Sequence, residues 1–158
     1  MLLPLAVLLV LVPIAAAKIP PPPEQSAVVQ TGRAPCGLAA RDGALWVGVY
    51  EAGAVLRLDR TGRVQQRFRV GRYACQLAVT ESAVWVTRDN ANAVVRIDRR
   101  TGRKRVARVS SPYGVVEAAG AIWVTSFETG TVTRLHPRTA RPTRVVRVGG
   151  NPTGVTRC

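Results

Sequence analysis

The stretch GALWVGVYEAGAVLRLDRTGRV, residues 43–64, decides the fold because the chain contains three versions of it. It returns as SAVWVTRDNANAVVRIDRRTGRKRV from Ser82 and as GAIWVTSFETGTVTRLHPRTARPTRV from Gly120. The three tryptophans, Trp46, Trp85 and Trp123, are 39 and 38 residues apart. Self-similarity at this period indicates a repeat architecture, in which one unit cannot bury its own apolar faces and needs stacked neighbours.

A shorter motif precedes each of the three copies of the repeat and occurs a fourth time near the end of the sequence. The tetrapeptides PCGL, ACQL, PYGV and PTGV begin at Pro35, Ala74, Pro112 and Pro152. Each copy then contains short apolar or alternating runs bounded by Gly, Asn, Asp or Pro, which is typical of strands, and no stretch sustains a helical period. We therefore predict an all-β fold of about three four-stranded antiparallel blades, with inner strands at about 34–40, 73–79 and 112–118, and one extra inner strand opened by PTGV.

Particular residues mark the turns between these runs. Gly53, Asn92 and Gly130 occur where a tight hairpin requires a positive φ, which Gly accepts freely and Asn tolerates. The sequence DRTG supplies Asp and Thr side chains that bond nearby backbone, followed by a glycine for the left-handed position. The third copy has Ala140 in place of that glycine, so we expect a strained or differently shaped turn there.

The combined pattern P-x-G-L/V, G-A-L/I-W-V and G-x-V-x-R-L/I-D-x-x-T-G resembles the repeat of the virginiamycin B lyase-like and YVTN-type seven-bladed β-propellers, relatives of the NHL-repeat proteins. The resemblance covers the sequence from about Val28 to its end. It implies a propeller in which SAVVQ, from Ser26, forms the outer strand of the last blade. Three full units stand where the family has seven, so we expect two open blade faces, with Trp46 or Trp123 facing water or another chain.

Three readings of this shortfall remain open. The sequence is a fragment of a longer protein, or it assembles with copies of itself through the exposed blade faces, or it forms an arc that is stable alone. We favour the fragment.

The N-terminal residues MLLPLAVLLVLVPIAAA carry no charged side chain and end in three alanines. The apolar run is short and is interrupted by Pro4 and Pro13, which favours a cleaved secretory signal over an uncleaved anchor or a misassigned start. We expect a secreted or periplasmic protein that contacts a membrane only if this segment is retained. The expected organisation is a signal at 1–17, a proline-rich linker at 18–26 and a partial propeller at 27–158, with blades at about 32–70, 71–109 and 110–148 and the start of another at 149–158.

The composition is that of a globular protein, with 158 residues of which 47% are hydrophobic and 20% are charged. Lys and Arg total 23 against nine Asp and Glu, which gives a formal net charge of +14. Arg57, Arg96 and Arg134 recur in the third strand of each unit, which predicts structural roles. The remaining arginines fall mostly on the outer strands and predict a basic, solvated perimeter. Nucleic acid is a disfavoured partner because no aromatic residues alternate with these charges and no DNA-reading motif is present.

The repeat places one polar set at a single rim of the predicted central channel. Its members follow the first residue of each inner-strand tetrapeptide or lie in the turn after W-V, and they are Cys36, Cys75, Tyr113, Thr153, Glu51, Asn90 and Glu128. As the family resemblance implies, we interpret this rim as a binding site for an unknown small-molecule or protein ligand. The alternative is that these are ordinary rim residues, since their spacing is not that of a metal site.

The resemblance also raises an enzyme hypothesis, because virginiamycin B lyase opens a lactone ring with a histidine and with acidic residues that hold magnesium. The single histidine, His136, stands where the first two units have Asp59 and Asp98, on the rim opposite the candidate site. We therefore expect a turn residue, not a general base. The prediction is a binding or scaffold module without catalytic residues or cofactors. The alternative is a lyase-like enzyme, with magnesium, that is complete only with further blades.

The three cysteines leave at least one thiol unpaired. Cys36 and Cys75 occupy equivalent positions in adjacent units, and a bridge between them requires Cα atoms within about 7 Å. Because neighbouring inner strands often stand farther apart, we expect two small buried thiols, and we expect Cys158 to be exposed. The sequence has no Cys-x-x-Cys pair, so zinc and redox sites have no support.

Overall fold

The computed structural model describes residues 28–156, which form three four-stranded antiparallel sheets. Within each sheet, each strand pairs with the next strand along the chain. Blade 1 contains β1 (Pro35–Arg41), β2 (Ala44–Val49), β3 (Ala54–Leu58) and β4 (Val64–Arg69). Blade 2 contains β5 (Ala74–Val79), β6 (Ala83–Arg88), β7 (Ala93–Asp98) and β8 (Lys104–Arg108). Blade 3 contains β9 (Pro112–Ala118), β10 (Ala121–Ser126), β11 (Thr131–Leu135) and β12 (Pro142–Arg147).

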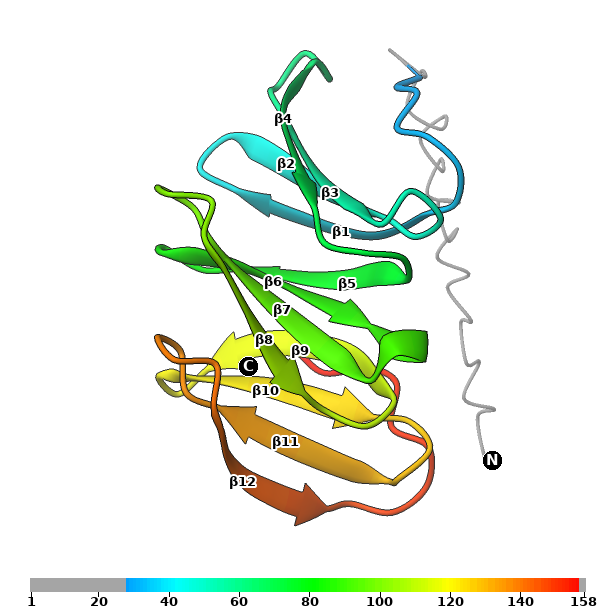
Figure 1. Ribbon diagram of the computed structural model, residues 1–158, viewed down its shortest axis with the longest axis vertical. Coiled ribbons are helices and arrows are strands. Elements are labelled where there is room, and N and C mark those ends of the chain that lie inside the picture. The colour runs from blue at the N-terminus through cyan, green and yellow to red at the C-terminus, as the bar shows by residue number, and fades with distance from the viewer. Residues whose placement is uncertain (1–27, 157–158) are drawn as a thin grey trace, which may run out of the picture.

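The three blades lie one above another along the long axis of the molecule (Figure 1). The first strand of each blade packs beside the first strand of the next, so β5 lies between β1 and β9. These strands start within one residue of the predicted inner strands. In the described residues the only helix is the single 3-10 turn η1 (Asp89–Ala91), and none is long and apolar enough to cross a membrane. The predicted signal and linker lie outside the described residues.

The turn residues adopt the backbone conformations that the sequence predicts. Gly53, Asn92 and Gly130 have φ values of 58°, 50° and 61°, in the left-handed region. Ala140 also has a positive φ, of 62°, where Gly62 and Gly102 have 83° and 71°. The predicted strain at Ala140 is therefore confirmed, because an alanine in this region is disfavoured by its Cβ.

The core lies between the blades, and each buried tryptophan faces the next blade along the chain. Trp46 clusters with Val84 and Ile97 of blade 2, and Trp85 clusters with Ile122 of blade 3. Trp46 and Trp85 are only 1% and 0% exposed. Trp123 is the equivalent residue of blade 3, and it is partly exposed because no fourth blade covers it in the described residues. The expectation that Trp46 or Trp123 lies on an open blade face is thus met by Trp123.

The opposite end of the stack is less open than expected. Val49, Leu56 and Leu58 are buried on the face of blade 1 that points away from blade 2. The segment 28–33 approaches this face, with Gly32 beside Val49. This segment forms no strand, so the outer-strand role that the resemblance implied for SAVVQ is not seen in its described part, Val28–Gln30. It has no partner sheet in the described residues with which to pair.

The segment 151–156, which contains PTGV, lies against β9 without forming a strand. The Thr125 hydroxyl donates to the Thr153 carbonyl at 3.2 Å, and Gly114 of β9 lies directly beneath Thr153. The same close approach joins Gly37 of β1 to the Cys75 backbone of β5. PTGV therefore occupies the position of a fourth inner strand, and no second strand pairs with it within residues 28–156.

Candidate functional site

The starts of the inner strands and the turns after the second strands share one face of the molecule. The strand register explains this, because Pro35 pairs with Val49 in blade 1 and Pro112 pairs with Ser126 in blade 3. We call this face the turn rim. All seven predicted site residues lie on it, at Cys36, Cys75, Tyr113, Thr153, Glu51, Asn90 and Glu128.

Cys36 and Cys75 are joined by a disulfide, and their Cα atoms are 4.8 Å apart. The expectation of two buried thiols is wrong. The strands approach closely because two glycines face the Cys75 carbonyl, Gly37 on β1 and Gly48 on β2, and a Cβ on either would collide with it. Neither sulfur is a free nucleophile or metal ligand, so the bridge contributes rigidity to the turn rim.

Tyr113 and Thr153 line a common cavity of about 410 Å³ between β5, β9 and the segment 151–156. Gln76 and Leu77 line it from the side of blade 2. The Tyr113 side chain is 38% exposed, and its ring centroid lies 6.2 Å from that of Phe127. The structure thus brings two of the predicted residues together in a space with both apolar and polar walls.

The three polar residues of the turns do not converge on that cavity. The Glu51 carboxylate pairs with Arg33, with Oε2 3.0 Å from Nε. The Asn90 side-chain amide donates to the Tyr50 hydroxyl at 2.7 Å, which links the turns of blades 1 and 2. Glu128 is exposed and makes no side-chain hydrogen bond or ion pair with any residue in 28–156.

The turn rim also holds two tyrosines that the sequence analysis did not identify. Tyr50 and Tyr73 pack edge to face, with ring centroids 5.4 Å apart. Burial, followed by the negative charge of Asp89, raises the pKa of the Tyr50 hydroxyl above its usual range. Their positions in the sequence could have placed them on the turn rim, because Tyr50 directly follows the strand that contains W-V and Tyr73 immediately precedes ACQL.

His136 lies on the opposite rim and closes the turn between β11 and β12. Its Nδ1 atom accepts hydrogen bonds from the backbone N–H groups of Arg138 and Thr139, at 3.2 and 3.3 Å. Asp59 accepts equivalent bonds from the turn of blade 1 through Oδ1. The prediction of a turn role for His136 is confirmed. Within residues 28–156, no group of His, Cys, Asp and Glu side chains is arranged to hold a metal ion.

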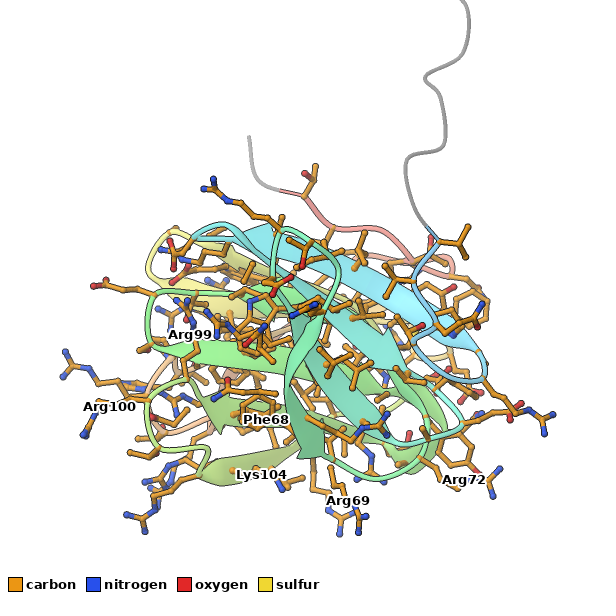
Figure 2. All side chains as sticks on the ribbon, turned by 90° about the horizontal axis from the view of Figure 1, so that it is seen from above. Phe68, Arg69, Arg72, Arg99, Arg100 and Lys104 are labelled. Carbon is orange, nitrogen blue, oxygen red and sulfur yellow. A yellow bond between two sulfur atoms is a disulfide. The ribbon has the colours of Figure 1, made fainter. Side chains whose placement is uncertain are left out.

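The recurring arginines of the third strands have the predicted structural roles. The Arg57 guanidinium lies over the Trp46 ring, 5.9 Å from its centroid. Arg96 is 7% exposed and donates through Nε to the Pro137 carbonyl at 3.0 Å. Arg134 donates to the Thr143 hydroxyl at 3.0 Å. The perimeter arginines differ, and Figure 2 shows Arg69, Arg72 and Arg100 extending outward from the edge of the blades.

Comparison with solved structures shows the fold. Hydrazine synthase of Kuenenia stuttgartiensis superposes with a TM-score of 0.72 at 15% identity, over 83% of this chain and 41% of that one. Virginiamycin B lyase of Staphylococcus aureus gives 0.67 at 17% identity, over 76% and 44%. BamB of Moraxella catarrhalis gives 0.64 at 20% identity, over 77% and 37%. The latter two are β-propeller repeat proteins, so the chain contains a partial β-propeller.

At these identities the likeness establishes the fold alone. The chain spans less than half the length of these three structures. No family model matches the sequence. A search of curated proteins also found no match.

Proposed function

We propose that this chain is an exported β-propeller module that binds a small-molecule or protein ligand at the turn rim and has no catalysis of its own. The observation that carries the proposal is the cavity of about 410 Å³ lined by Tyr113 and Thr153. Its size lies within the range of about 300–1,000 Å³ that is usual for ligand sites. It lies at the inner strands, beside the exposed aromatic pair Tyr113 and Phe127.

The disulfide supports the export part of the proposal. Disulfides persist in oxidising compartments and are rare in the cytosol, where thiols are kept reduced. The bridge between Cys36 and Cys75 therefore suits a secreted or periplasmic protein. Expression in a bacterial host should give an exported chain that starts at or close to Lys18, after the three alanines. Intact-mass analysis of the exported fraction measures this, and a chain that retains Met1 contradicts it.

The ligand site is tested by screening a small-molecule collection for compounds that raise the melting temperature of the exported chain. Each hit is repeated with Tyr113→Ala, which opens one wall of the cavity. The control is His136→Asp, which gives the opposite rim the residue found in the first two repeats. We expect the shift to vanish in the first variant and to remain in the second. Hits that keep their full shift in Tyr113→Ala would argue against this site.

The same exported wild-type chain and His136→Asp variant test the lyase alternative. Because Nδ1 of His136 accepts hydrogen bonds from backbone N–H groups of its own turn, the neutral ring carries its proton on Nε2 and has no free nitrogen lone pair with which to act as a general base. We therefore propose that this chain alone does not open the lactone of virginiamycin B, with or without added magnesium. Mass spectrometry combined with chromatography follows the ring-opened product, and its formation by the wild-type chain, but not by His136→Asp, would restore the enzyme hypothesis.

A further inference from the structure

A second cavity, of about 370 Å³, opens on the rim opposite the turn rim, between the outer part of blade 2 and the last turn of blade 3. We call it the blade 2–3 cleft. Its lining contains six cationic side chains, those of Arg96, Arg100, Arg103, Lys104, Arg105 and Arg138. Figure 2 shows Arg100 and Lys104 at the outer edge of the molecule, where solvent reaches them.

One carboxylate lines the cleft, and its bonding capacity is largely used by its own turn. Oδ1 of Asp98 accepts hydrogen bonds from the backbone N–H and the hydroxyl of Thr101, both at 2.9 Å. Oδ2 lies 3.7 Å from an Arg96 nitrogen. Arg96 is therefore held in place by Asp98 and by the Pro137 carbonyl, and it forms a fixed cationic wall.

The other five cationic side chains have no such partners. Among residues 28–156, the side chains of these five residues make no hydrogen bond and no ion pair. Arg105 also lies directly across the β7–β8 ladder from Arg96, and like charges at such positions destabilise a sheet. The cleft therefore sets six cationic side chains against the single carboxylate of Asp98.

The equivalent gap between blades 1 and 2 is different, which makes the charge a property of this cleft and not of the repeat. That gap has a second carboxylate in its lining, Glu81, in addition to Asp98, which lines both cavities. Its Arg99 is engaged by Asp42, with Nη2 2.8 Å from Oδ2. Where blade 2 has Arg105 opposite Arg96, blade 1 has Gln66 opposite Arg57.

We propose that the blade 2–3 cleft binds a compact ligand that carries several phosphate or sulfate groups. The guanidinium group donates two parallel hydrogen bonds to such oxyanions, and arginine is the residue that best matches their geometry. The cleft has cations on both walls, Arg105 from β8 and Arg138 from the turn of blade 3, so a single anion bridges the two blades. Its lining contains no aromatic side chain on which a base could stack, which favours a compact anion over a nucleic acid.

The test is calorimetric titration of the full chain with two probes, tripolyphosphate for phosphate groups and sucrose octasulfate for sulfate groups, in about 150 mM salt to screen distant charges. The cleft variant is Arg105→Gln with Arg138→Gln. It removes one cation from each wall, and its first change gives blade 2 the residue that blade 1 has at position 66. The matched control is Arg67→Gln with Arg69→Gln, which removes the same charge from exposed positions on β4.

We expect at least one probe to bind the wild-type chain, and the cleft variant to bind it about tenfold or more weakly, while the control stays within about twofold. Arg103→Gln is a second cleft variant, and it should weaken binding in the same direction. The preferred probe identifies the source of the anion, phosphate or sulfate. Absence of binding by both probes overturns the proposal. Equal weakening in the two double variants also overturns it, because it assigns the anion to the whole perimeter. Tyr113→Ala should leave anion binding unchanged, so this test is independent of the turn-rim site.

Discussion

The sulfur atoms of Cys36 and Cys75 are bonded to each other at the same position of two consecutive repeats, 39 positions apart in sequence. The bond joins the inner strands β1 and β5 and therefore links blades 1 and 2 covalently. Blade 3 has Tyr113 at the equivalent position, so packing and hydrogen bonds such as that from Arg96 to the Pro137 carbonyl hold it to blade 2 in place of a disulfide.

Loss of this bond should lower the stability of blades 1 and 2. A disulfide that closes a loop of this length restricts the unfolded chain and contributes about 2–4 kcal/mol. We expect Cys36→Ala with Cys75→Ala to lower the free energy of unfolding by this amount in urea titrations. Dithiothreitol should produce a similar loss in the wild-type chain and none in the variant. If the reductant destabilises both equally, the bond is not the cause.

The tryptophan of blade 2 should contribute far more to stability than that of blade 3. Trp85 is 0% exposed and packs between two blades, whereas Trp123 is only partly covered. Trp85→Ala should cost about 3–5 kcal/mol of unfolding free energy, as for other buried aromatic residues, and Trp123→Ala should cost clearly less. Urea denaturation followed by circular dichroism measures both. Equal losses would mean that Trp123 is covered in solution.

The Asp98 turn predicts a specific loss of stability in acid. Hydrogen bonds from Thr101, and then from Arg100 and the charge of Arg96, hold the pKa of the Asp98 carboxyl below its ordinary value of 3.8. A lowered pKa in the folded state contributes stability above the unfolded pKa, and this contribution disappears as the pH falls through the folded pKa. Asp98→Asn keeps the acceptor oxygen and removes the charge. The wild-type chain should be more stable than this variant at neutral pH, and the difference between the two urea midpoints should shrink as the pH falls below the ordinary carboxyl pKa of 3.8 and through the lowered folded-state pKa. A gap that persists unchanged in acid would contradict a charge effect.

The open face of blade 3 should make the chain associate with itself. Trp123 and Val132 lie on this face. The equivalent face of blade 1, which contains Trp46, is covered by blade 2. We expect sedimentation at micromolar concentration to show oligomers that about 1 M salt does not dissolve, because apolar contacts are not screened. Val132→Glu should shift the chain toward monomer. The control is Val106→Glu, which adds the same charge at a 59% exposed site on β8. A monomeric wild-type chain with cooperative unfolding would refute this prediction.

Local features of the fold were readable from the sequence because they depend on neighbouring residues. The strand runs are bounded by turn residues, and the left-handed positions at Gly53 and Asn92 follow from the conformational freedom of those residues. The substitution of Asp by His136 was also interpretable, because an imidazole nitrogen can accept the same backbone hydrogen bonds as a carboxylate.

Features that depend on the distance between blades were not readable. The disulfide forms because Gly37 and Gly48 let β1 and β5 approach. Gly37 directly follows Cys36, but the Cys75 carbonyl that it faces belongs to another blade, so the sequence alone did not predict this distance. The blade 2–3 cleft combines Arg105 and Arg138 from different blades in the same way. A comparison of the repeats does give one hint, since Arg105 replaces the glutamine found at position 66. Of the seven predicted site residues, only Tyr113 and Thr153 share a cavity, because Glu51 and Asn90 have partners within or beside their own turns.

The bridge between Cys36 and Cys75 also has a mechanical consequence. If the chain is pulled at its two ends, the segment between the cysteines, which are 39 positions apart, cannot extend while the bond is intact. At about 3.5 Å per extended residue, roughly 140 Å of contour length is withheld from the pulling force. Blade 3 lies outside the bridged loop and can unravel to its full length. The maximum extension of the pulled chain therefore depends on the redox state of its surroundings, and it is shorter where the bond is oxidised and longer where it is reduced.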